Sequence, residues 1–205
     1  MKVLLINGSP HKNGNTFLAL KQVADALQAE GIESEILALG THPVRSCVVC
    51  NTCKSKGDNR CVFDDDLCNR VTEKMKECDA LVIGSPVYYG QPNGGLMSLV
   101  QRALYSAGCY FAGKPAAAVA VCRRGGATAA LQTMNMPFQI LHMPLVSSQY
   151  WNIVYGRDAG EAAMDAEGMQ TLRSLAKNMA ALLKAMEGQP KPQYEPREAM
   201  NFIRK

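Results

Sequence analysis

The sequence predicts an α/β protein built on a doubly wound parallel sheet of five strands. Two observations carry this prediction: short, fully apolar runs recur along the chain, and segments whose apolar residues have helical spacing separate them. Apolar runs of this length without polar alternation are typical of strands that are buried on both faces. Alternation of such strands with helices specifies a parallel sheet that helices cover on both sides.

The first half of the chain is predicted to hold three strands and two helices. The strands cover residues 3–6, 32–39 and 79–84. Apolar residues recur at three- and four-residue spacing from Thr16, and Gly31 supplies a stop, which predicts a helix between them. A second helix is predicted from Asp64-Asp65-Asp66 to residue 77, because acidic side chains suit the positive end of a helix dipole. An irregular, cysteine-rich loop over residues 47–66 leads into it.

The second half continues the alternation. Helices are predicted over residues 95–107 and 161–187 and after the turn at Gly125-Gly126, and strands over residues 116–121 and 143–148. The last helix has apolar residues along one face, as a helix that packs on a sheet requires. Residues 1–188 are therefore expected to form one domain. Residues 189–205, which contain three prolines, are expected to form a C-terminal tail.

Composition excludes several classes of function. The net charge is only +4, and its basic residues are scattered, so neither a nucleic-acid surface nor a nucleic-acid partner is expected. No run approaches the roughly 20 apolar residues of a membrane span, so no membrane partner is expected. The apolar run at the N-terminus is too short for a signal peptide, and a cytoplasmic location is the expectation.

In doubly wound sheets, ligands bind outside the carboxyl ends of the strands, and three unusual loops follow predicted strands. The first runs from Gly8 to Thr16 and enters a helix directly, an arrangement that offers backbone N–H groups and a helix dipole to a phosphate. The side chains expected to bind it are those of Ser9, His11, Asn13, Asn15 and Thr16. An ordinary loop, with Asn15 or Thr16 capping the helix, is the alternative. Neither a P-loop nor a dinucleotide-binding pattern is present.

The second and third loops suit a flat, anionic ligand. Pro86, Val87, Tyr88 and Tyr89 follow the third strand, and two tyrosines in a loop fixed by proline and glycine suit an aromatic ring. Cys122, Arg123, Arg124 and Gly125 follow the fourth strand, where paired arginines suit an anion. The alternatives are tyrosines that pack on neighbouring helices and arginines that face solvent.

Taken together, these loops resemble the NADPH-dependent FMN reductase and iron–sulfur flavoprotein branch of the flavodoxin-like superfamily. The matching segments are Gly8-Ser9-Pro10 through Asn13-Gly14-Asn15-Thr16, Gly84-Ser85-Pro86-Val87-Tyr88, Lys114-Pro115 and Arg123-Arg124-Gly125-Gly126. The resemblance covers residues 1–185 and implies a flavodoxin-like sheet of strand order 2-1-3-4-5. It also implies FMN, with its phosphate on the first loop, its ring against the second, and the third loop at the ring's far edge. His11 stands where relatives often have arginine, so its charge depends on pH.

The cysteine-rich loop carries the sharpest local signal. Four of the eight cysteines form the pattern Cys47-x2-Cys50-x2-Cys53-x7-Cys61, whose two-residue gaps let successive thiolates wrap one metal centre. Such spacing is typical of iron–sulfur ligation, although four thiolates also suit zinc, and a set of metal-free thiols is the third reading. The resemblance implies a [4Fe–4S] cluster on these four residues, although the last gap is long for the family. Among the other cysteines, Cys68, Cys78 and Cys109 are expected in the core, and Cys122 beside the ring.

The leading function is that of an FMN-dependent oxidoreductase. Electrons would pass from NAD(P)H or a reduced protein donor through FMN to an acceptor, and no catalytic side chain is expected because the flavin carries the chemistry. The alternative is a flavodoxin-type electron carrier without a substrate of its own, whose cysteine-rich loop binds zinc or no metal. The resemblance further implies a homodimer or homotetramer, and the segment 47–66, Trp151 and the tail are the expected contacts.

Overall fold

The computed structural model describes residues 1–190, 192–196 and 198. Its centre is a sheet of five parallel strands: β1 (Lys2–Asn7), β2 (Glu33–Ala38), β3 (Ala80–Tyr88), β5 (Ala116–Cys122) and β6 (Ile153–Tyr155). Their order across the sheet is β2-β1-β3-β5-β6, so the predicted order of the parallel strands is confirmed. A sixth strand that the sequence did not predict, β4 (Gln91–Pro92), pairs antiparallel with the end of β3.

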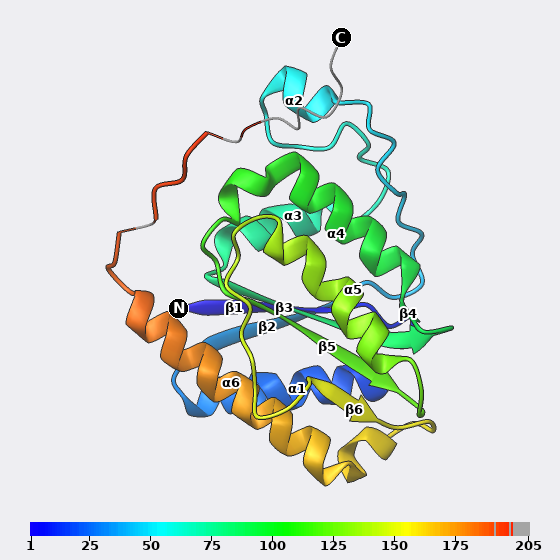
Figure 1. The fold of residues 1–205 in the computed structure, drawn as a ribbon. Coiled ribbons are helices and arrows are strands. Elements are labelled where there is room, and N and C mark those ends of the chain that lie inside the picture. The colour runs from blue at the N-terminus through cyan, green and yellow to red at the C-terminus, as the bar shows by residue number, and fades with distance from the viewer. Residues whose placement is uncertain (191, 197, 199–205) are drawn as a thin grey trace.

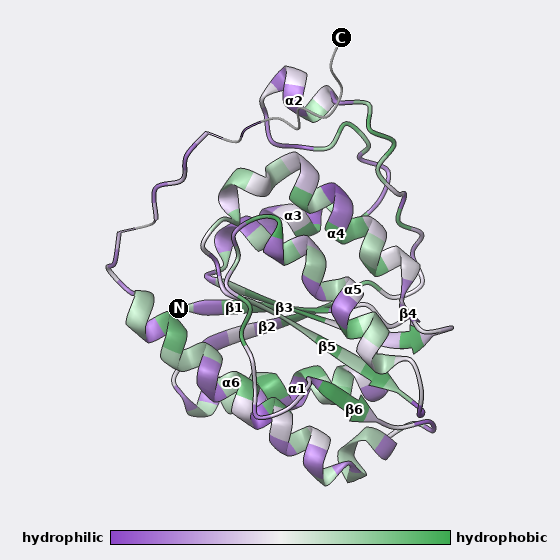
Figure 2. Ribbon diagram, viewed as in Figure 1, coloured by the Kyte–Doolittle hydropathy of each residue, from purple (hydrophilic) through white to green (hydrophobic). Residues whose placement is uncertain are grey.

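Helices cover both faces of the sheet, as predicted (Figure 1). On one face lie α1 (Asn15–Ala29) and α6 (Ala166–Met186), and on the other α3 (Cys68–Glu77), α4 (Gly94–Ala107) and α5 (Ala127–Gln139). The buried apolar residues accordingly form two clusters, one on each side of the sheet. Figure 2 shows β5 and β6 as strongly hydrophobic, which agrees with strands buried between helical layers.

The fifth parallel strand is not where the sequence predicted it. Residues 143–148 form no named strand and join the sheet through one isolated bridge, between Leu145 and Ala116. Pro144 has no N–H to donate, although its carbonyl accepts the N–H of Ala116. The chain then leaves the sheet and returns as β6, which pairs with Ala120–Cys122 at the carboxyl end of β5. The loop that follows the fifth parallel strand is therefore 156–160, a segment that the sequence analysis did not consider.

Two helix boundaries also differ from prediction. The helix expected from residue 64 begins at Cys68, because Asp64, Asp65 and Asp66 bind arginines instead of opening its first turn. The helix expected over 161–187 is divided into a 3-10 turn, η2 (Glu161–Met164), and α6. Asp165 separates the two, and its carboxylate accepts the N–H of Gly168 as the N-cap of α6.

Two further short elements and the tail complete the fold. A helix of one and a half turns, α2 (Thr52–Lys56), lies within the cysteine-rich loop, and a 3-10 turn, η1 (Gly108–Tyr110), follows α4. The predicted tail begins after α6 and forms no helix or strand where it is described; residues 191, 197 and 199–205 lie outside the described part. No described helix combines the length and the apolar character that crossing a membrane requires.

Candidate functional site

A cavity of about 760 Å³ lies at the carboxyl ends of the parallel strands. This is the place that the topology of a doubly wound sheet assigns to a ligand, and the volume is within the roughly 300–1,000 Å³ of ordinary ligand sites. Most of the predicted cofactor-binding residues line it: Ser9, His11, Asn13, Asn15, Thr16, Pro86, Val87, Tyr88, Cys122 and Arg123. Tyr89, Arg124 and Gly125 are not among the lining residues. Lys12, Gly14 and Val121 complete the wall on the first and third loops.

The first loop presents a helix N-terminus to this cavity. A chain of hydrogen bonds holds the loop in shape: the Asn7 side chain accepts the N–H of Ser9 at 3.0 Å, and the Ser9 hydroxyl accepts the N–H of His11 at 3.1 Å. Gly14 occupies the N-cap position and has no side chain that could accept the first N–H groups of α1. These groups, the buried Thr16 and the helix dipole therefore face the cavity as a place for an anion.

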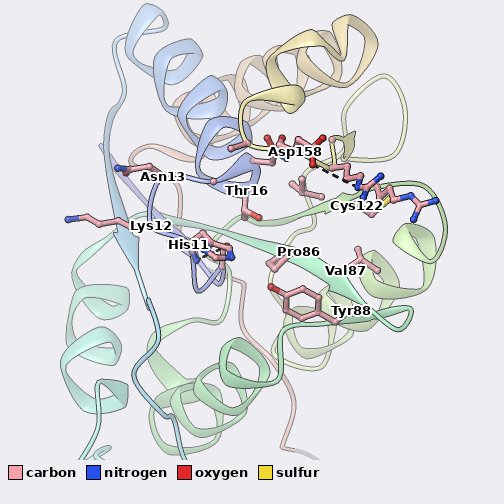
Figure 3. A pocket seen from close by; sticks show the side chains of 17 residues that line it. His11, Lys12, Asn13, Thr16, Pro86, Val87, Tyr88, Cys122 and Asp158 are labelled. Atoms are coloured by element: carbon pink, nitrogen blue, oxygen red, sulfur yellow. Dashed lines mark hydrogen bonds and ion pairs between the residues drawn. The ribbon is translucent and has the colours of Figure 1, made fainter.

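Figure 3 shows that the side chains of the first loop point in different directions. His11 and Thr16 are directed into the cavity, where His11 lies opposite Tyr88. The side chains of Lys12 and Asn13 extend away from its centre. The loop thus presents chiefly backbone, hydroxyl and imidazole groups to the cavity.

The Asn15 side chain joins the first loop to the loop after β6. Its amide nitrogen donates to the carbonyl of Asp158 at 2.9 Å, and its oxygen accepts the N–H groups of Gly160 and Ala162 at 3.1 and 3.2 Å. The side chain is therefore occupied with the loop after β6. It lines the cavity and at the same time ties two of its walls together.

The second loop is a tight hairpin between β3 and β4. Tyr88 pairs with Gln91, so Tyr89 and Gly90 are the two central residues, and both have positive φ, at 51° and 77°. Two-residue hairpin turns of this type require positive φ at both positions. The turn leaves Tyr89 fully exposed and outside the cavity, whereas Tyr88 stays half-buried in the wall (Figure 3). This partial burial raises the pKa of Tyr88, so the phenol stays neutral.

The third loop packs against the second. Gly126 has a φ of +86°, and a Cβ built on it would lie 2.7 Å from the Cα of Gly90. Only glycine fits at this position, which explains why the turn between β5 and α5 ends in glycine. Cys122 is buried in the cavity wall, and burial raises the pKa of its thiol. Arg123 is the arginine of the pair that reaches the cavity.

A fourth loop completes the cavity, and the sequence analysis missed it. Gly156, Arg157, Asp158 and Ala159 follow β6 and line the side next to the first loop. Gly156 donates its N–H to the Cys122 carbonyl at 3.0 Å, which continues the sheet pairing into the loop. The signal that could have found it is the apolar run of β6 ending in a glycine, the same pattern that marked the first loop.

The four cysteines line a second cavity, which shares no lining residue with the first. Cys47, Cys50, Cys53 and Cys61 surround it together with apolar side chains of the same loop and with Arg102, Tyr105 and Ser106 of α4. Figure 1 shows the loop and α2 beyond α4, away from the carboxyl ends of the strands.

The donor set of this cavity suits a thiolate-ligated metal group. All four predicted ligands line this one cavity, although no three His, Cys, Asp or Glu side chains of the described residues are grouped around a single ion position. A cluster attaches each cysteine to a different metal atom and so places its ligands more widely than one ion does. Hydrogen bonding by Thr52 lowers the pKa of Cys50 and favours its thiolate.

The remaining cysteines separate into two environments. Cys68 and Cys78 are buried in the core, as predicted, and burial raises the pKa of Cys68 to about 11. Cys109 was expected to be buried and is exposed. It lies on η1 at the end of α4, where its thiol contacts the Asn59 side chain of the cysteine-rich loop at 3.4 Å.

Trp151 lies away from the first cavity. With Tyr150, at a ring-centroid distance of 4.9 Å, it forms an exposed aromatic pair beside a smaller hollow next to β6.

Comparison with known sequences decides the family. Residues 1–158 match the family described as NADPH-dependent FMN reductase. The chain belongs to this family. It is also 34% identical over 195 residues to an iron–sulfur flavoprotein of Methanocaldococcus jannaschii, with 91% of this chain and 100% of the relative covered. A second iron–sulfur flavoprotein, from Archaeoglobus fulgidus, is 32% identical over 199 residues, with 90% of this chain and 96% of the relative covered.

Solved structures of the same architecture agree with the fold of this NADPH-dependent FMN reductase family member. RosB with a bound 8-demethyl-8-formylriboflavin-5′-phosphate intermediate superposes with a TM-score of 0.72 at 17% identity, covering 93% of this chain and 81% of RosB. A flavodoxin from the domain Archaea gives a TM-score of 0.60 at 14% identity, covering 90% and 99%. The fold is therefore flavodoxin-like, and the chain is a member of an FMN-binding oxidoreductase family.

Proposed function

We propose that this protein binds FMN in the first cavity and acts as an FMN-dependent oxidoreductase that also holds a [4Fe–4S] cluster. One observation carries the proposal: a single cavity of about 760 Å³ joins an uncapped helix N-terminus to a wall of proline, tyrosine and arginine. The first end suits a phosphate, and the second suits a flat ring with an anionic edge. Family membership supports FMN as the ligand.

The residues of the first cavity then have distinct tasks. The N-terminal N–H groups of α1, with Ser9, Thr16 and His11, bind the phosphate of FMN. Pro86, Val87 and Tyr88 lie along the ring. Arg123 comes from the third loop and places positive charge near the ring's edge. The buried, neutral thiol of Cys122 fills the wall behind it.

FMN, when bound, supplies hydride and single-electron transfer, so the chain needs no acid–base pair of its own. The protein orients the ring, excludes water from its covered side and favours the anionic reduced form through arginine. We propose NAD(P)H or a reduced protein as the electron donor. A flavodoxin-type carrier without a substrate is the alternative, and turnover with NADPH or NADH separates the two.

Cys47, Cys50, Cys53 and Cys61 are the proposed ligands of the cluster. The support is their common cavity, the two-residue spacing and the iron–sulfur flavoproteins among the relatives. Such a cluster exchanges single electrons, which suits a protein partner as donor or acceptor. In this proposal, the first cavity holds the flavin and the second holds a cluster that exchanges single electrons with a partner.

The test is an anaerobic purification followed by a visible spectrum and quantification of flavin, iron and sulfide. We expect FMN bands with iron and sulfide near four per chain. The variants Cys47→Ser and Cys53→Ser should lose iron and keep flavin, whereas Cys109→Ser, outside the cysteine cavity, should keep both. Zinc in place of iron, or no metal, would overturn the proposal of a cluster. Absence of flavin even after incubation with FMN would overturn the whole proposal.

The quaternary structure belongs to the same proposal: a homodimer or homotetramer, as the resemblance implies. Trp151, at 56% exposure, and the exposed cysteine-rich loop are the surfaces proposed for contact. Light scattering on the purified holoprotein tests this, and a monomer would overturn it.

A further inference from the structure

Arg102 is a buried charge that the functions assigned so far do not use. It lies in the middle of α4, is only 1% exposed, and forms part of the wall of the cysteine cavity. A fully buried guanidinium is expensive unless its donors are satisfied, so its partners indicate what it does.

Its side-chain hydrogen-bond partners lie in the segment 45–66, most of which is the cysteine-rich loop. One terminal nitrogen donates to the Asp66 carboxylate and to the Arg45 carbonyl, and the other donates to the Phe63 carbonyl at 2.9 Å. The Nε–H donates to the sulfur of Cys61, with Nε and Sγ 3.3 Å apart. Arg102 thus connects Cys61, the last of the four proposed ligands, to α4.

The guanidinium has no freedom to turn away from the sulfur. Asp66 is itself fixed, because its carboxylate also accepts the backbone N–H groups of Arg45 and Cys68 at 3.0 and 2.9 Å. The guanidinium plane is set by these contacts on both terminal nitrogens, and the Nε–H direction follows from that plane. The hydrogen bond to sulfur is therefore built into the packing of the loop on α4.

We propose that Arg102 is a positioning residue that orients the Cys61 sulfur toward the cluster and raises the cluster's reduction potential. This inference rests on the proposed function. A hydrogen bond to a ligating sulfur, and a positive charge beside it, favour the more negatively charged reduced state. Thr52 also hydrogen-bonds Cys50, and the backbone N–H of Val49 contacts Cys47 at 3.4 Å, but Arg102 brings a positive charge to its sulfur.

A purely structural role of Arg102 would lead to a different result. If Arg102 only fastened the loop to α4, breaking its ion pair would matter as much as removing its contact with sulfur. Asp66→Asn weakens the ion pair and leaves the Nε–H donor in place. Arg102→Gln removes that donor and the charge. Arg102→Lys keeps the charge but loses the planar guanidinium, whose N–H groups have fixed directions. Arg60→Gln is the matched control, because Arg60 forms an exposed ion pair with Asp64 in the same loop.

The experiment measures the midpoint potential of the anaerobic holoprotein by EPR-monitored titration with dithionite, together with iron, sulfide and flavin content. For Arg102→Gln we expect the equilibrium constant for one-electron reduction to fall about tenfold, a negative shift of about 59 mV. Arg102→Lys should shift less, and Arg60→Gln should match the wild type. Asp66→Asn should not lower the potential, because it removes a negative charge and keeps the Nε–H donor, although it should lower the thermal stability. A loaded Arg102→Gln variant with the wild-type potential overturns the inference.

A second measurement covers the case in which the Arg102 variants do not fold or load. Wild-type protein labelled with ¹⁵N-arginine is reduced by one electron, and its pulsed EPR spectrum is searched for coupling to arginine nitrogen. Coupling that Arg60→Gln retains supports the hydrogen bond to Cys61, and its absence overturns the inference. Wild-type protein without iron and sulfide overturns the proposed function first, so the two failures are distinct.

Discussion

The side-chain amide of Asn15 donates to the backbone carbonyl of Asp158 across 143 residues of sequence, at 2.9 Å. The same side chain accepts the N–H groups of Gly160 and Ala162. Asn15 stands at the first position of α1, and Asp158 belongs to the loop after β6. One residue therefore couples the loop proposed for phosphate binding to the fourth wall of the cavity.

Replacement of Asn15 by alanine is expected to weaken FMN binding without unfolding the protein. The fourth loop loses three hydrogen bonds and its fixed distance from the first loop, which corresponds to about a tenfold higher Kd or more. The measurement is a fluorescence titration of the apoprotein with FMN. Asn13→Ala is the control, because Figure 3 shows the Asn13 side chain directed away from the cavity. Equal Kd values for Asn15→Ala and the wild type would contradict the coupling.

Gly126→Ala is expected to destabilise the contact between the second and third loops. The new Cβ would lie 2.7 Å from the Cα of Gly90, in a backbone conformation with φ of +86° that side chains rarely adopt. Strain of this kind costs about 1–3 kcal/mol. Urea unfolding of the variant measures it. Gly94→Ala provides the control, since a Cβ there meets nothing within 4 Å, and its stability should equal or exceed that of the wild type.

The sequence predicts the sheet well because short, fully apolar runs are compatible with few structures other than buried parallel strands. It fails at the fifth strand, where residues 143–148 and 153–155 are both apolar and only tertiary pairing with β5 selects between them. That single error also explains the missing fourth loop, because this loop follows β6, which the sequence did not predict. The tripled aspartate misleads for a related reason: two of its partners, Arg45 and Arg102, are distant from it in sequence.

Tyr88 and Tyr89 provide a matched pair, because adjacent residues of the same type have opposite environments. Tyr88 lines the cavity, and Tyr89 is fully exposed at the tip of the hairpin. Loss of an aromatic contact with a flat ring corresponds to roughly 0.5–1.5 kcal/mol, so Tyr88→Ala should raise the Kd for FMN several-fold up to about tenfold. Tyr89→Ala should leave the Kd unchanged. A larger effect at Tyr89 would place the ring outside the cavity described here.

The sequence could not distinguish these two tyrosines, and the reason is geometric. Both stand in one loop between proline and glycine, and their difference arises from the register of β3 with β4. Likewise, nothing local marks Arg102 as a partner of Cys61, since the two are 41 residues apart and meet only when the loop packs on α4. Residue types identified the chemistry of the sites, and the strand and helix packing decided which side chains take part.

Glu35 makes part of the folding stability dependent on pH. Its carboxylate bonds Lys2 of β1 at 2.8 Å and also Lys74 of α3, and these bonds lower the pKa of Glu35 below its usual 4.5. A carboxyl whose pKa is lower in the folded chain stabilises the fold above the unfolded pKa, and the contribution is lost as pH falls through the folded value. Because the Glu35 side chain is 32% exposed, solvent screens the interaction.

Glu35→Gln is therefore expected to lower the free energy of unfolding at neutral pH by less than about 1 kcal/mol. The difference from the wild type should shrink as pH falls below about 4.5 and vanish once Glu35 is protonated in both states. Urea unfolding at a series of pH values measures this, and a double-mutant cycle with Lys74→Met isolates the pair. A coupling energy that stays undiminished after the pH has fallen through the folded pKa of Glu35 would show that the contact is not electrostatic, since the carboxyl then carries no charge.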